Sequence, residues 1–359
     1  MREQPGAVSI DDMPSGLETH VLRRRLLQLA ALLALVGLAI TLVPGLADVR
    51  EGLNDATPGW LVLAAALEVL SCLAYVAAFR AAFCARMTWR MSYRLGMSSL
   101  GAASLLPVGG VGGLALGAWA LRRSGLPAER IARRTVAFFL ITSAVNVAAV
   151  IAIGTAVALG LLAGPDSLVL SAGPALVAVT AVLLVTLAAP RLARRVEHGW
   201  SAPGRHRLLR AAARALDATA DGIDEAVVLL RSKDVRLLAG AVGYLAFDLA
   251  VFWACFRAFG PTSPLAVLFL AYLLGQLGAL VPLPGGLGGV DFGLIGALVI
   301  FGVPPAAAAV GVLAYRALLL WLPAVLGGLA FWALKRSLRD DGDSRIPCAE
   351  DLPAVTARV

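Results

Sequence analysis

The sequence is short of charged residues. They make up 15% of its 359 residues, whereas 59% are hydrophobic and the mean hydropathy is +0.83. This balance excludes an ordinary soluble domain. Apolar runs of about twenty residues, the length that crosses a bilayer core of roughly 30 Å, recur along nearly the whole chain. The composition therefore predicts an all-α integral membrane protein with no sizeable soluble domain.

Metal-binding and nucleotide-binding patterns are also missing. The three histidines lack metal-ligand spacing, and the four cysteines are scattered without a CxxC pair, so we expect neither a zinc site nor a disulfide framework. No Gly-Lys-Ser/Thr sequence occurs, and the glycine turns lack the third glycine of a dinucleotide fingerprint. We expect no cofactor. The net charge of +8 comes largely from arginines at the ends of apolar runs, which indicates membrane orientation and no nucleic-acid partner.

The chain repeats itself at an offset of 177 residues. Residues 106–113 (LPVGGVGG) align with 283–290 (LPGGLGGV), and 14 of 49 positions are identical between 79–127 and 256–304. The aligned pairs include Arg80 with Arg257 and a Gly-x-Pro at 125–127 with one at 302–304. Duplicated hydrophobic segments that are broken by glycine and proline are typical of two-fold membrane transporter folds, with the site at the breaks.

The distribution of arginine predicts the topology. Full spans are expected at 26–46, 59–83, 135–163, 168–189, 237–259 and 306–334, and the broken segments are 95–121 and 265–301. Basic clusters flank the first broken segment on both sides, so a re-entrant hairpin keeps both in the cytoplasm, whereas a full span would not. The second hairpin then enters from outside. Three crossings separate equivalent elements, so the two repeats have opposite orientations.

The predicted fold is therefore six full spans plus two opposed re-entrant hairpins in an inverted repeat, which can also be counted as eight membrane helices. The repeats cover 26–163 and 168–334, and a basic cytoplasmic loop covers 190–236, with an amphipathic helix near 207–231. Cytoplasmic tails are expected at 1–25 and 335–359. We expect a multi-pass protein of the plasma membrane.

Charged and polar residues inside the apolar segments are the first site candidates, because each charge is costly at the bilayer centre. Arg316 lies ten residues into its span, and Asp291 directly follows the second glycine turn. The remaining members of this group are Glu68, Asp248, Asn146 and Gln276. One interpretation is that Arg316 pairs with an acid and holds the helices together. The other is that the group lines a polar path for a lipid headgroup or a proton.

The glycine turns and the basic residues beside them form the second group. Glycine permits a positive φ and close approach of a ligand, although it also permits close helix packing. Arg80, Arg257, Arg122 and Arg123 either extend to the membrane interface or gather anionic headgroups. The turn residues are Pro107, Gly109, Gly110, Gly112, Gly113, Pro284, Gly285, Gly286 and Gly289.

Two stretches resemble the lysylphosphatidylglycerol synthase transmembrane (flippase-like) family. One is 106–113 followed by 119–125 (WALRRSG), and the other is 282–291 (PLPGGLGGVD) followed by 302–304, Tyr315-Arg316 and 321–323 (WLP). The resemblance covers roughly 60–334. It places in motif positions the proline and glycine residues Pro107, Gly109, Gly110, Gly113, Pro284, Gly285, Gly286, Gly289 and Pro323, together with Arg123 and Arg316.

The resemblance implies translocation of phospholipids with anionic or aminoacylated headgroups between leaflets. Two-domain members of that family also carry a cytoplasmic aminoacyl-transfer domain. This sequence ends about 25 residues after its last predicted span, so we expect a transporter without synthase activity. Two alternatives stay open, which are a membrane scaffold for a separately encoded lipid or cell-wall enzyme and a small-solute or ion secondary transporter.

Overall fold

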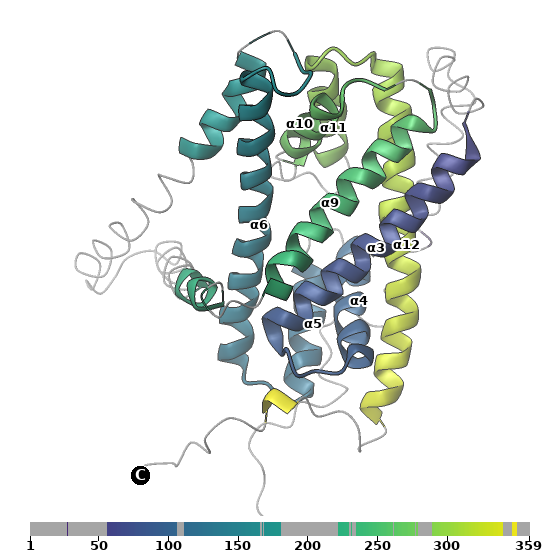
Figure 1. Ribbon diagram of the computed structural model, residues 1–359. Coiled ribbons are helices and arrows are strands. Elements are labelled where there is room, and N and C mark those ends of the chain that lie inside the picture. Colours follow the sequence, from purple (N-terminus) through teal and green to yellow (C-terminus); the bar gives the residue numbers. More distant parts are fainter. Residues whose placement is uncertain are drawn as a thin grey trace, which may run out of the picture.

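A computed structural model describes residues 27, 56–105, 111–165, 167, 169–180, 222–229, 231, 235–260, 262–276, 278, 289–339 and 347–349. The described part is helical, and its principal elements are shown in Figure 1. In chain order they are α3 (Pro58–Phe83), α4 (Trp89–Leu105), α5 (Val111–Arg123), α6 (Ala128–Ala158), α9 (Val235–Arg257), α10 (Leu265–Gly275), α11 (Gly289–Ile300), α12 (Pro305–Arg339) and the short 3-10 helix η4 (Pro347–Ala349).

Helices α3 and α9 cross antiparallel at the centre of the molecule (Figure 1). At one end, the Thr57 amide donates to the Ala258 carbonyl over 2.7 Å. Near the middle, the Ser71 hydroxyl donates to the Tyr244 carbonyl over 3.2 Å. The two backbones approach closely at Gly240, where an added Cβ would lie only 2.6 Å from the amide nitrogen of Ala78. Glycine is therefore needed at position 240 for this close approach.

Each broken segment forms a pair of antiparallel helices. Helices α4 and α5 pack together, and the Ser99 hydroxyl donates to the Gly113 carbonyl over 2.6 Å. Helices α10 and α11 form the equivalent pair in the second repeat. A Cβ on Gly278 would lie 2.1 Å from the carbonyl oxygen of Gly289, so that contact also depends on glycine. Figure 1 shows both pairs beginning and ending at the same side of the molecule, on opposite sides for the two repeats.

The 177-residue repeat is visible in the turn that follows each pair. Gly125 and Gly302 occupy equivalent positions and have positive φ values of 98° and 86°. The amides of Leu126 and Gly125 donate to the carbonyls five and three residues earlier, and Val303 and Gly302 do the same. This is the Schellman arrangement, in which a left-handed glycine ends a helix. The proline two residues after each glycine, Pro127 or Pro304, then lies immediately before the long helix α6 or α12.

Packing between the repeats is reciprocal. The hairpin helix α4 packs against α12, and its counterpart α10 packs against α6. Helices α6 and α12 run in opposite directions, as do α3 and α9 (Figure 1). The helix bounds also match at the same offset, since α3 begins at Pro58 and α9 at Val235. Helices at equivalent positions of the 177-residue offset therefore have matching neighbours, and the long helices α6 and α12 are antiparallel.

Four of the described helices are long and apolar enough to cross a membrane: Pro58–Phe83, Ala128–Ala158, Val235–Arg257 and Pro305–Ser337. They correspond to four of the six predicted spans. Of the predicted span 168–189, the structure describes an apolar helix at Val169–Thr180. The predicted span 26–46 lies outside the described residues, apart from position 27, and most of the loop helix predicted at 207–231 does too. Both predicted breaks are confirmed by the separate helices α4, α5, α10 and α11.

Large apolar side chains cover much of the outer surface. The exposed set includes Val62, Leu73, Phe139, Phe292, Leu329 and Trp332. Exposure of so many large apolar residues is typical of a surface that faces lipid. This agrees with an all-α membrane protein.

The expectation that the cysteines form no disulfide was wrong. Cys84, directly after α3, is bonded to Cys348 in η4. The two residues are 264 positions apart, so no spacing motif marks them as partners. The bond fastens the described C-terminal segment to the end of α3, and the Arg130 guanidinium adds a hydrogen bond of 3.4 Å to the Cys348 carbonyl. Cys72 and Cys255 are free and buried.

Candidate functional site

Arg316 of α12 is ion-paired with Asp291 in the first turn of α11. The Arg316 Nη2 donates to the Asp291 Oδ2 over 3.3 Å, and the Nε contacts the other carboxylate oxygen. Both side chains are 28% exposed. Asp291 also lies at the start of a helix, where the helix dipole stabilises a negative charge. The structure therefore joins two residues that the sequence predicts as candidates, at the tip of the second hairpin.

The carboxylate of Asp248 lies at the centre of a buried hydrogen-bond network. It is 6% exposed, and both oxygens accept hydrogen bonds from tyrosine hydroxyls. The Tyr315 hydroxyl donates to Oδ1 over 2.9 Å, and the Tyr272 hydroxyl donates to Oδ2. The two hydroxyl oxygens are 3.4 Å apart. Asp248 also interacts electrostatically with Arg316 on the same helix as Tyr315.

Glu68 extends this network across the crossing of α3 and α9. It is 2% exposed, and its Oε1 accepts a weak hydrogen bond of 3.7 Å from the Cys72 thiol. Its other oxygen, Oε2, is buried without a hydrogen-bond partner among the described residues. Glu68 interacts electrostatically with Asp248. A buried carboxylate oxygen with no partner is costly, so such a group in a protein interior calls for a functional explanation.

Together these side chains form a connected unit, which we call the central polar cluster: Glu68, Asp248, Tyr272, Asp291, Tyr315 and Arg316. It draws on α3 from the first repeat and on α9, α10, α11 and α12 from the second. Carboxylates accept ammonium groups or protons, and a guanidinium donates to phosphate or carboxylate oxygens. The cluster therefore presents groups that match both signs of a zwitterionic headgroup.

The other predicted residues lie outside the cluster. Arg80 and Arg257 stack over Trp89 and Trp60, with 4.9 Å and 5.3 Å between guanidinium carbon and ring centroid. Arg122 and Arg123 end α5. Asn146 is exposed on α6, and Gln276 follows α10 at its end.

The structure describes only some of the predicted glycine-turn residues. Gly113 lies in the contact between α4 and α5, where a Cβ would be 2.4 Å from the Ser99 carbonyl oxygen. The carbonyl oxygen of Gly289 lies against Gly278, where a Cβ would clash with it. Gly112 lies in the first turn of α5. The remaining turn residues lie outside the described part of the chain: Pro107, Gly109, Gly110, Pro284, Gly285 and Gly286.

The sequence-based reasoning missed Tyr272 and Tyr315. A signal was present, because the chain has only five tyrosines and these two interrupt strongly apolar helices. A buried tyrosine hydroxyl usually has a hydrogen-bond partner, so each one predicts a polar neighbour. Tyr315 also immediately precedes Arg316, which places two polar side chains on consecutive positions of a span.

Comparison with known proteins adds one match. The family described as the lysylphosphatidylglycerol synthase TM region matches residues 25–327. A search of curated proteins found nothing that matches the chain. The matched region contains every described helix from α3 to α11 and most of α12, and it includes the whole central polar cluster.

Proposed function

The chain belongs to the lysylphosphatidylglycerol synthase TM region family, and from this premise we propose that it moves phospholipids between the leaflets of a membrane. The membership supports a lipid-related membrane protein. The proposal adds the activity, the path and the topology, which is an inverted repeat of six spans with two opposed re-entrant hairpins.

The observation that carries the proposal is the ion pair between Arg316 and Asp291 at a hairpin tip. Arg316 is eleven residues into α12, roughly 16 Å along the helix axis, which is about half the thickness of a bilayer core. Charges at this depth are rare in membrane helices and usually mark a substrate or ion pathway. Broken helices that meet near the midplane are the usual place for such a site in repeat transporters.

The chemistry of the cluster suits a phospholipid headgroup. The Arg316 guanidinium would donate to phosphate oxygens, and the unpartnered Glu68 oxygen would accept from an amine. In the described structure Glu68 and Asp248 are almost completely buried. Transport therefore requires the helices around the cluster to separate, so the structure corresponds to a closed state in this proposal.

The test uses the purified full chain in vesicles that contain a fluorescent phospholipid in both leaflets. Dithionite added outside bleaches half of the label in protein-free vesicles, because lipids there do not exchange. Vesicles with the chain should lose nearly all of it within minutes. Comparing headgroups of phosphatidylglycerol, its lysyl ester and phosphatidylcholine would identify the preferred lipid. Bleaching that stops at half for every headgroup would refute lipid exchange.

A second candidate function is transport of protons or small cations. Glu68 and Asp248 are almost completely buried, which favours this candidate because a proton reaches a buried carboxylate more readily than a headgroup does. The same vesicles, loaded with a pH-sensitive dye, separate the two functions. Proton flux without lipid exchange would support this candidate and refute the first.

A further inference from the structure

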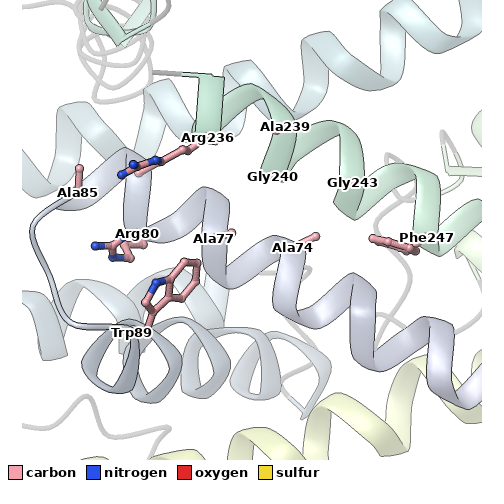
Figure 2. A pocket seen from close by; sticks show the side chains of 11 residues that line it. Ala74, Ala77, Arg80, Ala85, Trp89, Arg236, Ala239, Gly240, Gly243 and Phe247 are labelled. Carbon is pink, nitrogen blue, oxygen red and sulfur yellow. The ribbon is translucent and has the colours of Figure 1, made fainter. Parts of the chain in front are cut away.

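The disulfide joins a firmly held segment to a loosely held one. Cys84 lies in the turn that follows α3, and Figure 2 shows this turn at Ala85, with Arg80 and Trp89 beside it. The Cys84 amide donates to the Arg80 carbonyl over 3.0 Å, and the Met87 amide donates to the Cys84 carbonyl over 3.0 Å. The Arg80 Nε also donates to the Met87 carbonyl over 2.6 Å, and its guanidinium stacks over Trp89. Cys84 is therefore held in place by contacts that do not involve the disulfide.

The Cys348 side of the bond is held more weakly. Cys348 lies in the three-residue helix η4, near the start of α6 (Figure 1). The hydrogen bond from the Arg130 guanidinium to the Cys348 carbonyl is long, at 3.4 Å. The Cys348 side chain is 7% exposed, but the neighbouring Pro347 is exposed. The disulfide is therefore the strongest contact that the structure describes for η4, and cutting it leaves a weak hydrogen bond and one small buried side chain.

Arginine side chains lie near both ends of the bond. Arg130 reaches the Cys348 carbonyl, and Arg134, one turn later on α6, donates over 2.8 Å and 3.1 Å to the last two carbonyls of α3, directly before Cys84. Glu225 pairs with Arg134 over 3.1 Å and compensates part of its charge. A guanidinium near a cysteine favours the thiolate, which is the form that attacks and leaves in thiol–disulfide exchange. The surroundings therefore favour exchange of this bond with an external thiol.

We propose that Cys84 and Cys348 form a site of reversible thiol–disulfide exchange with glutathione, and that reduction releases η4 from the end of α3. One glutathione thiolate attacks a sulfur of the bond and forms a mixed disulfide, while the other cysteine leaves as a thiolate and takes up a proton. A second glutathione cleaves the mixed disulfide, so the products are two cysteine thiols and one oxidised glutathione. Oxidised glutathione drives the reverse reaction and docks η4 again.

The site lies outside the central polar cluster, and its chemistry does not depend on lipid transport, so the inference goes beyond the proposed function. Glutathione is the thiol of choice because the proposed topology places this end of the molecule in the cytoplasm, where glutathione keeps thiols reduced. The exchange itself is measured on the purified chain. Failure of lipid exchange in vesicles would refute transport and leave the thiol exchange standing.

The first test incubates the purified full chain, folded in detergent, in buffers with different ratios of reduced to oxidised glutathione. Free thiols are then alkylated, and a digest quantifies the linked peptides of Cys84 and Cys348. Half of the bond should be reduced at a ratio within the cytoplasmic range while the chain stays folded, and the bond should form again in oxidised glutathione. Structural disulfides resist reduction by the glutathione pool. A bond that is reduced only after the chain unfolds overturns the proposal.

The second test measures the release of η4 by the rate at which a maleimide reagent alkylates Cys348 in the reduced, folded chain. Cys255 is the internal control, because it is a free cysteine that is completely buried. Reduced wild type should alkylate Cys348 at least tenfold faster than Cys255. Cys84→Ser, which cannot form the bond, should show the same fast rate at every glutathione ratio, and its melting temperature shows whether it is folded. The comparison within wild type does not depend on this variant. If Cys348 reacts as slowly as Cys255, η4 stays docked after reduction and the proposal is wrong.

Discussion

Gly101 of α4 and Gly327 of α12 are in direct backbone contact. A Cβ on Gly101 would lie 2.7 Å from the Cα of Gly327, and a Cβ on Gly327 would lie 2.6 Å from the Cα of Gly101. The Pro323 carbonyl oxygen is equally close to the Gly101 position. The first hairpin therefore packs on the last long helix through paired glycines, the arrangement by which membrane helices approach most closely.

We expect Gly327→Ala to lower the free energy of unfolding by about 1–3 kcal/mol, the usual cost of overpacking a tight contact. Gly328→Ala is the matched control, because a Cβ at Gly328 has nothing within 4 Å. That control should be neutral or slightly stabilising, since alanine is the better helix former. Thermal unfolding of the detergent-solubilised chain measures both. Equal stability of the two variants would show that α4 and α12 are not packed through Gly327.

The re-entrant hairpin predicts that both ends of the α4–α5 pair face the same side of the membrane. Ser92 and Ser124 would be obvious labelling positions at these ends, but both are buried. Cysteines at the exposed positions Arg90 and Glu129 should instead react with an impermeant reagent from one side. A cysteine at Leu161, beyond the far end of α6, should react from the other side. Labelling of Arg90 and Glu129 from opposite sides would make this segment a full span.

The Cys84–Cys348 bond should be found as a linked pair of peptides in a non-reducing digest. Cys84→Ser and Cys348→Ser should each lower the melting temperature, and the double variant should lower it no further because both changes remove one bond. Additive effects would mean that the two residues act separately. The bond lies at the end of the molecule that carries the basic clusters, which the proposed topology places in the cytoplasm. Thiols in the cytoplasm are normally kept reduced. A bond that persists in cells would therefore argue for the inverse orientation.

Arg316→Ala should destabilise the protein because it leaves Asp291 without its ion-pair partner. Removing one member of a buried pair costs roughly 3–5 kcal/mol, and the partial exposure of this pair places the expected loss below that range. Arg316→Lys should recover only part of the loss, since an ammonium cannot donate in the two-pronged geometry of a guanidinium. Arg336→Ala, an exposed arginine on the same helix, serves as the control. Unchanged melting of Arg316→Ala would show that the ion pair contributes nothing to stability.

Features that depend on neighbouring residues or on a regular spacing could be predicted from the sequence. The breaks in the apolar segments, the 177-residue repeat and the candidates Arg316 and Asp291 all follow from local composition and spacing. The positions of helix ends were predicted less accurately. Helix α6 begins at Ala128, whereas the predicted span begins at 135, because hydropathy marks the bilayer and not the helix. The intervening turns are polar and carry an ion pair between Arg133 and Glu129 of 3.7 Å.

Features that depend on distant partners could not be predicted. Asp248 and Tyr315 are 67 residues apart, and their hydrogen bond follows from how α9 and α12 pack. The same holds for Cys84 with Cys348, and for the backbone hydrogen bond from Thr57 to Ala258, which forms because α3 and α9 cross antiparallel. No local sequence pattern specifies such a crossing. The 177-residue offset shows which residues are equivalent in the two repeats, but it does not show which residues are in contact.

The most direct test of the account is dithionite bleaching of fluorescent phospholipid in vesicles that contain wild type, Arg316→Ala or Arg336→Ala at equal protein content. Wild type and Arg336→Ala should exchange lipid between leaflets until nearly all label is bleached. Arg316→Ala should slow exchange at least tenfold, measured below its own melting temperature so that the folded protein is compared. If wild type leaves half of the label protected, or if Arg316→Ala exchanges lipid at the wild-type rate, the central polar cluster is not a path for lipid headgroups.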